Sequence, residues 1–274
     1  MNEREIFIHP TATVHPEAQL DAGVWIGPYS FIGEKVILHK KTKIDSHVSI
    51  DGLTEIGESC RFFPFSSIGT EPQDLTYKGE ETRVKLGDRN IFREMVSINR
   101  GTVKGRKQTV IGNDNYFMAY SHVGHDCIVG NETVFINAAT LGGHVTVDDY
   151  ATMGAFSGVH QFCRVGKYAF IGGFTVATQD VLPFCRVAGI RPTHLYGLNS
   201  IGLRRRGFSR ERIGNLKEMF KIFFYSELNT TQALKKIEEQ FPPNEDRDEI
   251  INFVKSSKRG IIKKGSEKWD IESG

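Results

Sequence analysis

Apolar residues recur at every sixth position over the first two thirds of the chain. A period of six is neither helical nor the simple alternation of a strand. It is the hexapeptide signature of a parallel β-helix, a prism of short strands whose apolar side chains point inward and stack from coil to coil. The positions are Ile8, Val14, Leu20, Ile26, Ile32, Leu38, Ile44, Ile50, Ile56, Phe62 and Ile68, then Leu86, Phe92 and Ile98, then Ile111, Phe117, Val123, Val129, Phe135, Leu141, Val147, Met153, Val159, Val165, Ile171 and Ala177.

Two other places in the hexad are also restricted. The fourth residue after the apolar one is usually small or β-branched, as at Ser30, Cys60 and Ala139, and we expect it to point into a tight interior. The residue directly after the apolar one is often glycine, as at Gly27 and Gly154, where we expect turns that need a positive φ. Three hexads make one coil, and the repeat predicts between eight and nine coils.

Insertions and a change of period divide the chain. The register breaks at about 70–83 and at 104–109, and both segments are expected to bulge outward as loops, which commonly carry function on a solenoid. After Pro183 the sixfold period ends. We therefore predict a β-helix over 1–183 with these two external loops, and a linker with a C-terminal α-helical domain over 184–274.

The C-terminal part shows helical spacing. Ser209 is an expected N-cap for a helix with one apolar face. A second helix is predicted over 231–240 and a third from near Asn244. The apolar face of the first helix is formed by Ile213, Leu216, Phe220, Phe223 and Phe224.

Composition narrows the class of protein. The 274 residues carry 35 Lys and Arg against 33 Asp and Glu, a net charge of +2, which argues against a general nucleic-acid binder. No apolar run is long enough to span a membrane. Charges within residues 1–5 argue against a signal peptide, so a cytoplasmic location is expected. Local positive charge lies in the second insertion and in the C-terminal tail, at Lys104, Arg106, Lys107, Lys255, Lys258, Arg259, Lys263 and Lys264.

Four of the nine histidines fall close together, at His122, His125, His144 and His160. Because hexads three apart share a face of the prism, the hexads of Val123, Leu141 and Val159 stack on one another. Adjacent rungs are about 4.8 Å apart. The four imidazoles are therefore expected on one face, or its edge, over three coils, which indicates a functional site.

Two chemistries fit this cluster. Imidazoles bind zinc, as in a zinc-dependent γ-type carbonic anhydrase, or one of them serves as a general base. The dipeptide His125-Asp126 favours the base, because a carboxylate can orient the ring and raise its basicity. A non-catalytic β-helix scaffold is a further alternative. Cysteine nucleophiles are not expected, because Cys60, Cys127 and Cys163 occupy the small inward position.

Specific motifs add a resemblance that covers essentially the whole chain. The sequence resembles the acyl-carrier-protein–dependent UDP-N-acetylglucosamine O-acyltransferases, hexapeptide-repeat enzymes that start lipid A biosynthesis. The resemblance is carried by the segments His122-Val123-Gly124-His125-Asp126-Cys127, Leu141-Gly142-Gly143-His144, Val159-His160-Gln161-Phe162-Cys163, Pro72-Gln73-Asp74-Leu75, Gly79-Glu80, Arg100-Gly101-Thr102, Gly197-Leu198-Asn199, Arg205-Arg206-Gly207-Phe208-Ser209 and Ser257-Lys258-Arg259-Gly260.

The resemblance implies a left-handed β-helix, a homotrimer with sites between subunits, and transfer of a 3-hydroxyacyl chain from acyl carrier protein to the 3-position of the UDP-sugar. It implies that His125 is the base, that Asp126 supports it and that the Gly143 N–H holds the oxyanion. No metal or resident cofactor is expected, since phosphopantetheine arrives on the carrier protein. The implied substrate-binding residues are Gln73, Asp74, His122, His144, His160 and Gln161 for the sugar and acyl group, Gly173 for acyl length, and Asn199, Arg205 and Arg206 for the nucleotide.

Two positions depart from the family pattern. Thr76 stands where many members have Lys, and Asn99 stands where many have His. Both lie near the expected site. They leave open a second substrate, a 3-amino sugar analogue that would be acylated as an amide.

Overall fold

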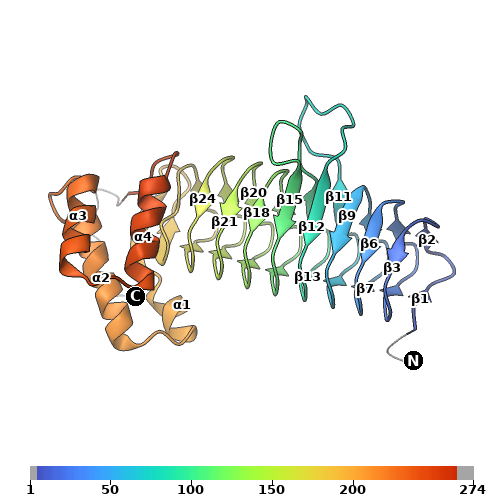
Figure 1. Ribbon diagram of the computed structural model, residues 1–274, viewed down its shortest axis with the longest axis horizontal. Helices are drawn as coiled ribbons and strands as arrows, with labels where there is room; N and C mark the ends of the chain where they lie inside the picture. Colours follow the sequence, from blue (N-terminus) through green and yellow to red (C-terminus); the bar gives the residue numbers. More distant parts are fainter. Residues whose placement is uncertain (1–4, 264–274) are drawn as a thin grey trace.

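The computed structural model describes residues 5–263, in which the chain winds as a prism of short strands (Figure 1). Each coil contributes one strand to each of three parallel sheets. Strands β1 to β24 form eight coils, and β25, β26 and a bridge at Val181 form most of a ninth. The coil number predicted from the repeat is confirmed.

The three sheets have eleven, nine and eight strands. The first sheet contains β1 (Phe7–Ile8), β4 (Trp25–Ile26), β7 (Lys43–Ile44), β10 (Arg61–Phe62), β13 (Ile91–Phe92), β16 (Tyr116–Phe117), β19 (Val134–Phe135), β22 (Thr152–Met153), β25 (Phe170–Ile171), β27 (Cys185–Ala188) and β28 (His194–Leu198). The second contains β2 (Thr13–Val14), β5 (Phe31–Ile32), β8 (Ser49–Ile50), β11 (Ser67–Thr70), β14 (Ser97–Asn99), β17 (His122–Val123), β20 (Thr140–Leu141), β23 (Gly158–Val159) and β26 (Val176–Ala177). The third contains β3 (Gln19–Leu20), β6 (Val36–Leu38), β9 (Leu53–Ile56), β12 (Arg83–Leu86), β15 (Gln108–Ile111), β18 (Ile128–Val129), β21 (Thr146–Val147) and β24 (Arg164–Val165).

The core is a set of columns inside the prism. In the first sheet the rings of Phe62, Phe92, Phe117 and Phe135 are fully buried and stack with centroids 4.6–5.0 Å apart. The small fourth position is buried too, as at Cys60. Because each ring is covered only by the coils on either side, the coils stabilise one another.

The glycine expectation was wrong in its physical reason. Apart from Gly69 just before the first loop, positive φ falls not on the residue directly after the apolar one but two places later, at non-glycine residues such as Tyr29 and Phe156. Glycine at the earlier place is needed for close approach between coils. A Cβ on Gly154, for example, would lie 2.5 Å from the carbonyl carbon of Gly172 in the next coil.

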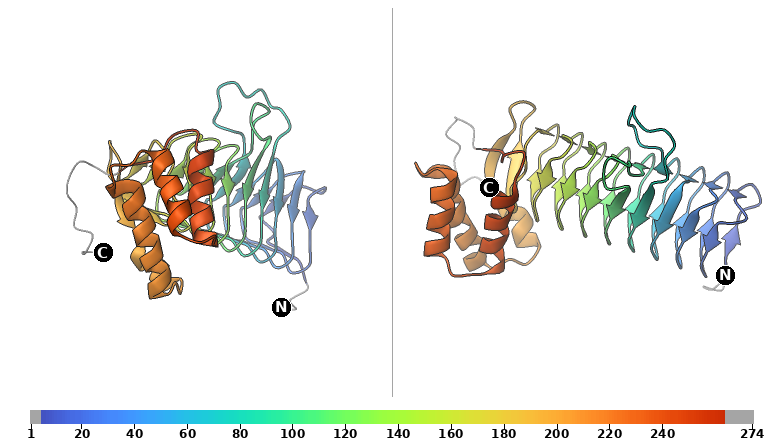
Figure 2. Two further views of the ribbon diagram at one scale, coloured as in Figure 1. Left: turned by 60° about the vertical axis from the view of Figure 1, so that its left-hand side comes forward. Right: turned by 45° about the horizontal axis from the view of Figure 1, so that its top comes forward.

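Both predicted loops are present and project from the same side of the prism (Figures 1 and 2). The first loop joins β11 to β12 and the second joins β14 to β15.

The sheets continue past the predicted domain boundary at residue 183. Strand β27 pairs in parallel with β25, and β28 returns antiparallel to β27.

Within the part of the chain that the structure describes, four helices cover the C-terminal end of the prism (Figure 2). The predicted helices correspond to α2 (Arg210–Tyr225), capped by Ser209 as expected, α3 (Thr230–Gln240) and α4 (Glu245–Ser256). The short helix α1 (Ser200–Arg205), capped by Asn199, was not predicted, because six residues show no clear period.

Within residues 5–263, no helix is both long enough and apolar enough to cross a bilayer. Residues 1–4, used in the signal-peptide argument, and Lys264 of the basic tail lie outside the described residues.

Candidate active site

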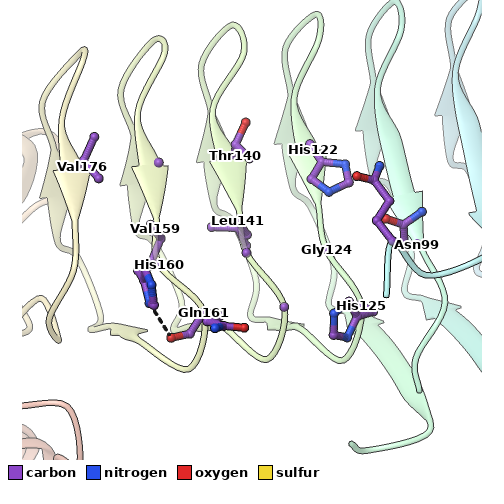
Figure 3. A pocket seen from close by; sticks show the side chains of 14 residues that line it. Asn99, His122, Gly124, His125, Thr140, Leu141, Val159, His160, Gln161 and Val176 are labelled. Atoms are coloured by element: carbon purple, nitrogen blue, oxygen red, sulfur yellow. Dashed lines mark hydrogen bonds between the residues drawn. The ribbon is translucent and has the colours of Figure 1, made fainter. Parts of the chain in front are cut away.

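The histidine cluster lies along the second sheet, as the hexad register predicted. Strands β17, β20 and β23 stack, with His122 opposite Thr140 and Thr140 opposite Gly158. The turns after these strands carry His125, His144 and His160–Gln161. A pocket of about 510 Å³ opens at this edge (Figure 3). It is lined by Gln73, Asn99, His122, Gly124, His125, Thr140, Leu141, Gly142, Gly143, Gly158, Val159, His160, Gln161 and Val176.

His125 and Asp126 form a close pair in this pocket. Nδ1 of His125 lies 2.9 Å from Oδ2 of Asp126, whose side chain is fully buried while that of His125 is 16% exposed. Burial by itself would raise the pKa of Asp126, but hydrogen bonds from His125, Thr102 and Arg106 outweigh it and hold that pKa below its usual value. The carboxylate therefore stays ionised and orients the imidazole with Nε2 free for a proton.

The second loop holds Asp126 in place. Thr102 donates from its backbone N–H (3.0 Å) and its hydroxyl (2.7 Å) to Oδ2, and the Arg106 N–H donates to Oδ1 at 2.7 Å. The Arg106 guanidinium also donates to the Asp126 carbonyl. A Cβ on Gly105 would lie 2.4 Å from the carboxyl carbon, so only glycine fits there.

These loop contacts were missed from the sequence. The basic character of the loop pointed to a partner, whereas one of its three cations, Arg106, is already engaged with Asp126. The available signal was the position of the insertion, which is one coil from Asp126.

His144 lies behind His125 rather than in the pocket wall. Its ring meets that of His125 edge-on at 5.0 Å and stacks on Phe162 at 4.4 Å. Burial lowers the pKa of His144, and burial also lowers that of His122, whose Nδ1 lies 2.8 Å from the Ser97 hydroxyl. Both rings are thus kept neutral at physiological pH.

Gly143 lies directly against the imidazole of His125. A Cβ on Gly143 would come within 2.5 Å of Cε1 of His125, so any side chain would displace the imidazole. Among residues 5–263, the Gly143 N–H donates to no other backbone group or side chain. This donor is therefore available to a ligand beside the His125 ring.

The first loop supplies Gln73 to the pocket wall, with Asp74 beside it. Asp74 accepts hydrogen bonds from the N–H and hydroxyl of Thr76, both at 2.8 Å, and these lower its pKa. Asn99 is 3% exposed and fastens the base of this loop by donating to Thr70 Oγ1 and the Glu71 carbonyl. Its own Oδ1 has no partner among the described residues.

One group of ligand atoms resembles a metal site. Among residues 5–263, nitrogen atoms of His125 and His144 and a carboxylate oxygen of Asp126 lie within 4.8 Å of one another. However, Oδ2 of Asp126 already accepts from His125 and twice from Thr102, and Oδ1 accepts from Arg106. A cation would have to displace these donors, so the group fits a hydrogen-bonded base better than a metal centre.

The cysteines behave as packing residues. All four are buried and unpaired, and burial raises the pKa of Cys60 and of Cys127 to about 12. A thiol with so high a pKa is a poor nucleophile. Burial therefore supports the expectation that these cysteines do not act as nucleophiles.

The predicted nucleotide-binding residues do not lie at the histidine pocket. Asn199, Arg205 and Arg206 line a separate hollow of about 530 Å³ on the first sheet, with Val134, Thr152 and Phe170. Asn199 also caps α1, and Arg206 pairs with Glu132 at 2.5 Å. Gly173 lies in the turn from β25 to β26, outside the wall of the histidine pocket, where the one neighbour of an added Cβ would be the Ala155 carbonyl at 3.3 Å. The structure thus separates the expected nucleotide-binding residues and Gly173 from the wall of the histidine pocket.

The fold and the site define a β-helical acyltransferase. Residues 180–262 match a family model described as UDP N-acetylglucosamine O-acyltransferase, domain 2. The acyl-[acyl-carrier-protein]–UDP-N-acetylglucosamine O-acyltransferase of Thermodesulfovibrio yellowstonii is 47% identical over 263 residues, covering 96% of this chain and 100% of the relative. That of Stenotrophomonas maltophilia is 43% identical, covering 93% of this chain and 97% of the relative.

Solved structures agree with these relatives. The UDP-N-acetylglucosamine acyltransferase of Francisella novicida superposes with a TM-score of 0.90 at 38% identity, covering 94% of each chain. That of Bacteroides fragilis has a TM-score of 0.90 at 39% identity, covering 94% of this chain and 100% of the other. This chain belongs to the acyl-[acyl-carrier-protein]–UDP-N-acetylglucosamine O-acyltransferase family, and its β-helix is left-handed, as expected.

Proposed function

We propose that the protein transfers a 3-hydroxyacyl chain from acyl carrier protein to the 3-hydroxyl of UDP-N-acetylglucosamine, the first step of lipid A biosynthesis. The observation that carries the proposal is the His125–Asp126 pair, at 2.9 Å, facing a pocket beside the Gly143 N–H, which has no acceptor among the described residues. This is the arrangement that base-catalysed acyl transfer needs.

The proposed reaction runs in two steps. His125 Nε2 takes the proton of the sugar hydroxyl while its oxygen attacks the thioester carbon, and the Gly143 N–H stabilises the resulting oxyanion. The carbon–sulfur bond then breaks, and the leaving thiolate of phosphopantetheine takes the proton from His125. The products are the sugar ester and the free carrier thiol, and the enzyme supplies no resident cofactor.

The separate arginine hollow supports a site shared between subunits. Arg205 and Arg206 suit a nucleotide diphosphate, since guanidinium groups bind phosphate oxygens in pairs. Within one subunit they lie on the first sheet and the histidines on the second. Packing of one prism beside another would bring the hollow of one subunit to the pocket of the next.

One corner of the prism supports a homotrimer. Exposed apolar residues follow the first-sheet strands at the positive-φ position, each 43–64% exposed. The matching position after the third-sheet strands is polar at Lys41, Ser59, Arg89, Asp114 and Glu132, and aromatic after the last two strands, at Tyr150 and Tyr168. A continuing apolar ridge along the first-sheet corner indicates a contact surface. It consists of Tyr29, Phe65, Met95, Tyr120, Phe156 and Phe174.

Asn99 favours a second candidate substrate, the 3-amino sugar. The unpartnered Oδ1 of Asn99 is a buried acceptor at the pocket wall. After the base has taken one proton, an attacking amine still carries an N–H, whereas an attacking hydroxyl has no hydrogen left. A desolvated N–H needs an acceptor, and Asn99 offers one.

The test is incubation of the protein with UDP-N-acetylglucosamine or its 3-amino analogue and a panel of 3-hydroxyacyl carrier proteins, read by mass spectrometry. The main proposal expects an ester on the hydroxyl sugar. An amide product alone would favour the second candidate. No acylated sugar from any donor, together with activity that needs stoichiometric zinc, would overturn both.

A further inference from the structure

The segment after α4 returns to the β-helix and is fastened there at several points. Oδ2 of Asp180 accepts from the Ser257 hydroxyl at 2.7 Å. The backbone of Asp180 pairs with that of Gly260 (2.8 Å) and Ile262 (3.0 Å), and Asp180 is 1% exposed. The backbone on both sides of Arg259 is therefore held against the coil that follows His160.

This attachment brings Arg259 to the catalytic pocket. Nη2 of Arg259 lies 3.1 Å from Nδ1 of His160, although the residues are 99 positions apart in the sequence. His160 lines the same pocket as His125 (Figure 3). The Ser257-Lys258-Arg259-Gly260 motif thus contacts the pocket through Arg259, a contact that could not be predicted from the sequence.

Two groups compete for the same ring nitrogen. The Gln161 carbonyl oxygen is 3.2 Å from Nδ1 of His160, drawn as a dashed line in Figure 3, and it can only accept a proton. The Arg259 guanidinium can only donate. If Nδ1 carried the proton, the Nδ1–H and the guanidinium N–H would point at each other, and two donors cannot form a hydrogen bond. Because a charged donor makes the stronger hydrogen bond, Arg259 selects the tautomer in which Nδ1 is unprotonated.

We propose that Arg259 is a positioning residue that holds His160 with its proton on Nε2. Nε2 is the ring nitrogen left for a ligand, so His160 then presents a fixed N–H donor to an acceptor oxygen of the bound substrate. Without Arg259 the Gln161 carbonyl would draw the proton to Nδ1, and Nε2 would become an acceptor. This inference rests on the proposed function for its kinetic consequence but not for the tautomer.

The direct test is ¹⁵N NMR of histidine-labelled full-length protein at a pH where the ring is neutral, with the His160 signals assigned by their loss in His160→Gln. The wild type is expected to show unprotonated Nδ1, Arg259→Ala to show protonated Nδ1, and Arg259→Lys to keep the wild-type state. Lys258→Ala, which changes the adjacent cation, is the matched control and is expected to change nothing. A protonated Nδ1 in the wild type, or no change in Arg259→Ala, would overturn the inference.

Kinetics supply a second readout. Arg259→Ala is expected to lower kcat/KM for the UDP-sugar about tenfold, the size expected for losing one well-placed hydrogen bond. In the His160→Gln background the same change should cost less than twofold, because the two residues act as one unit. Equal losses in both backgrounds would show that Arg259 acts independently of His160. A tautomer switch in a protein that acylates no sugar would instead contradict the proposed function alone.

Discussion

Oδ2 of Asp126 lies 2.9 Å from Nδ1 of His125, and this contact joins two neighbours in sequence whose backbone turns sharply between them. Asp126 adopts a φ of 60°, in the left-handed region. The strain of that conformation is offset by four hydrogen bonds to its carboxylate and one from its N–H to Thr109. Changes at His125 and at the hydrogen-bond partners of Asp126 should therefore affect both activity and stability.

Removing the base should abolish most turnover. His125→Ala is expected to lower kcat at least 100-fold in a protein that still folds, because general base catalysis contributes about that factor. The thermal unfolding midpoint should fall modestly, because the variant also loses one hydrogen bond to the buried Asp126 carboxylate. Steady-state kinetics measure kcat and thermal unfolding measures the midpoint, with exposed His15→Ala as the control. A variant keeping more than a third of wild-type turnover would exclude His125 as the base.

Loosening Asp126 should weaken both activity and stability. Thr102→Val removes one hydrogen bond to the carboxylate, about 1.5–3 kcal/mol of unfolding free energy at pH 7. Because the pKa of Asp126 is lower in the folded protein than in the unfolded chain, its contribution is present above about pH 4 and is lost as the pH falls through the folded value. The gap between wild type and variant should therefore shrink in acid.

Urea unfolding from pH 7 down to the lowest pH at which the protein stays folded measures this gap. Thr13→Val, an exposed strand position, is the control and should behave as wild type. A gap that stays constant with pH would mean that Thr102 acts independently of the Asp126 charge.

Gly143 should tolerate no side chain. In Gly143→Ala the new Cβ would lie 2.5 Å from the His125 ring, so kcat is expected to fall at least tenfold in a folded protein. The matched control is Gly214→Ala in α2, where a Cβ meets nothing within 4 Å. That change should keep activity and raise stability by up to about 1 kcal/mol. Full activity in Gly143→Ala would show that the imidazole is not confined there.

Gly173 is predicted to set the acyl length. An added Cβ there meets only the Ala155 carbonyl, so space remains beside the turn. We expect the wild type to prefer a long 3-hydroxyacyl chain and Gly173→Met to prefer one several carbons shorter, since each buried methylene contributes about 0.8 kcal/mol. Competition between donors of different length decides this. An unchanged length profile would transfer the role to another residue, with the exposed Phe174 next.

Positive charge on the second loop is predicted to attract the carrier protein. With Arg106 engaged at Asp126, Lys104 and Lys107 remain exposed for an acidic partner. KM for the carrier-bound donor should rise with salt, because exposed charges are screened over about 8 Å at physiological ionic strength. Charge reversal at both lysines should raise KM as well, whereas Lys43→Glu on the first sheet should not. A KM that is flat with salt contradicts the prediction.

The prism and the histidine face were predictable because they repeat. The pattern within each hexad shows which side chain is buried, and similar hexads stack on one another, so the same packing is repeated along the whole prism. Coil number, inward cysteines and the alignment of His122, His125 and His160 all follow from counting. The close approach that requires glycine at Gly154 did not, since it depends on backbone in the next coil.

Tertiary structure decided what lies outside the repeat. Thr102 and Arg106 reach Asp126 because a loop without period folds back over it, and Arg259 reaches His160 because a segment 99 residues later pairs with Asp180. Arg205 and Arg206 line a hollow on another sheet from the histidines, and the repeat could not place them because they follow its end. The physical reason is the same in each case: a repeat specifies contacts one coil apart, whereas contacts between unrelated segments depend on the path of the whole chain.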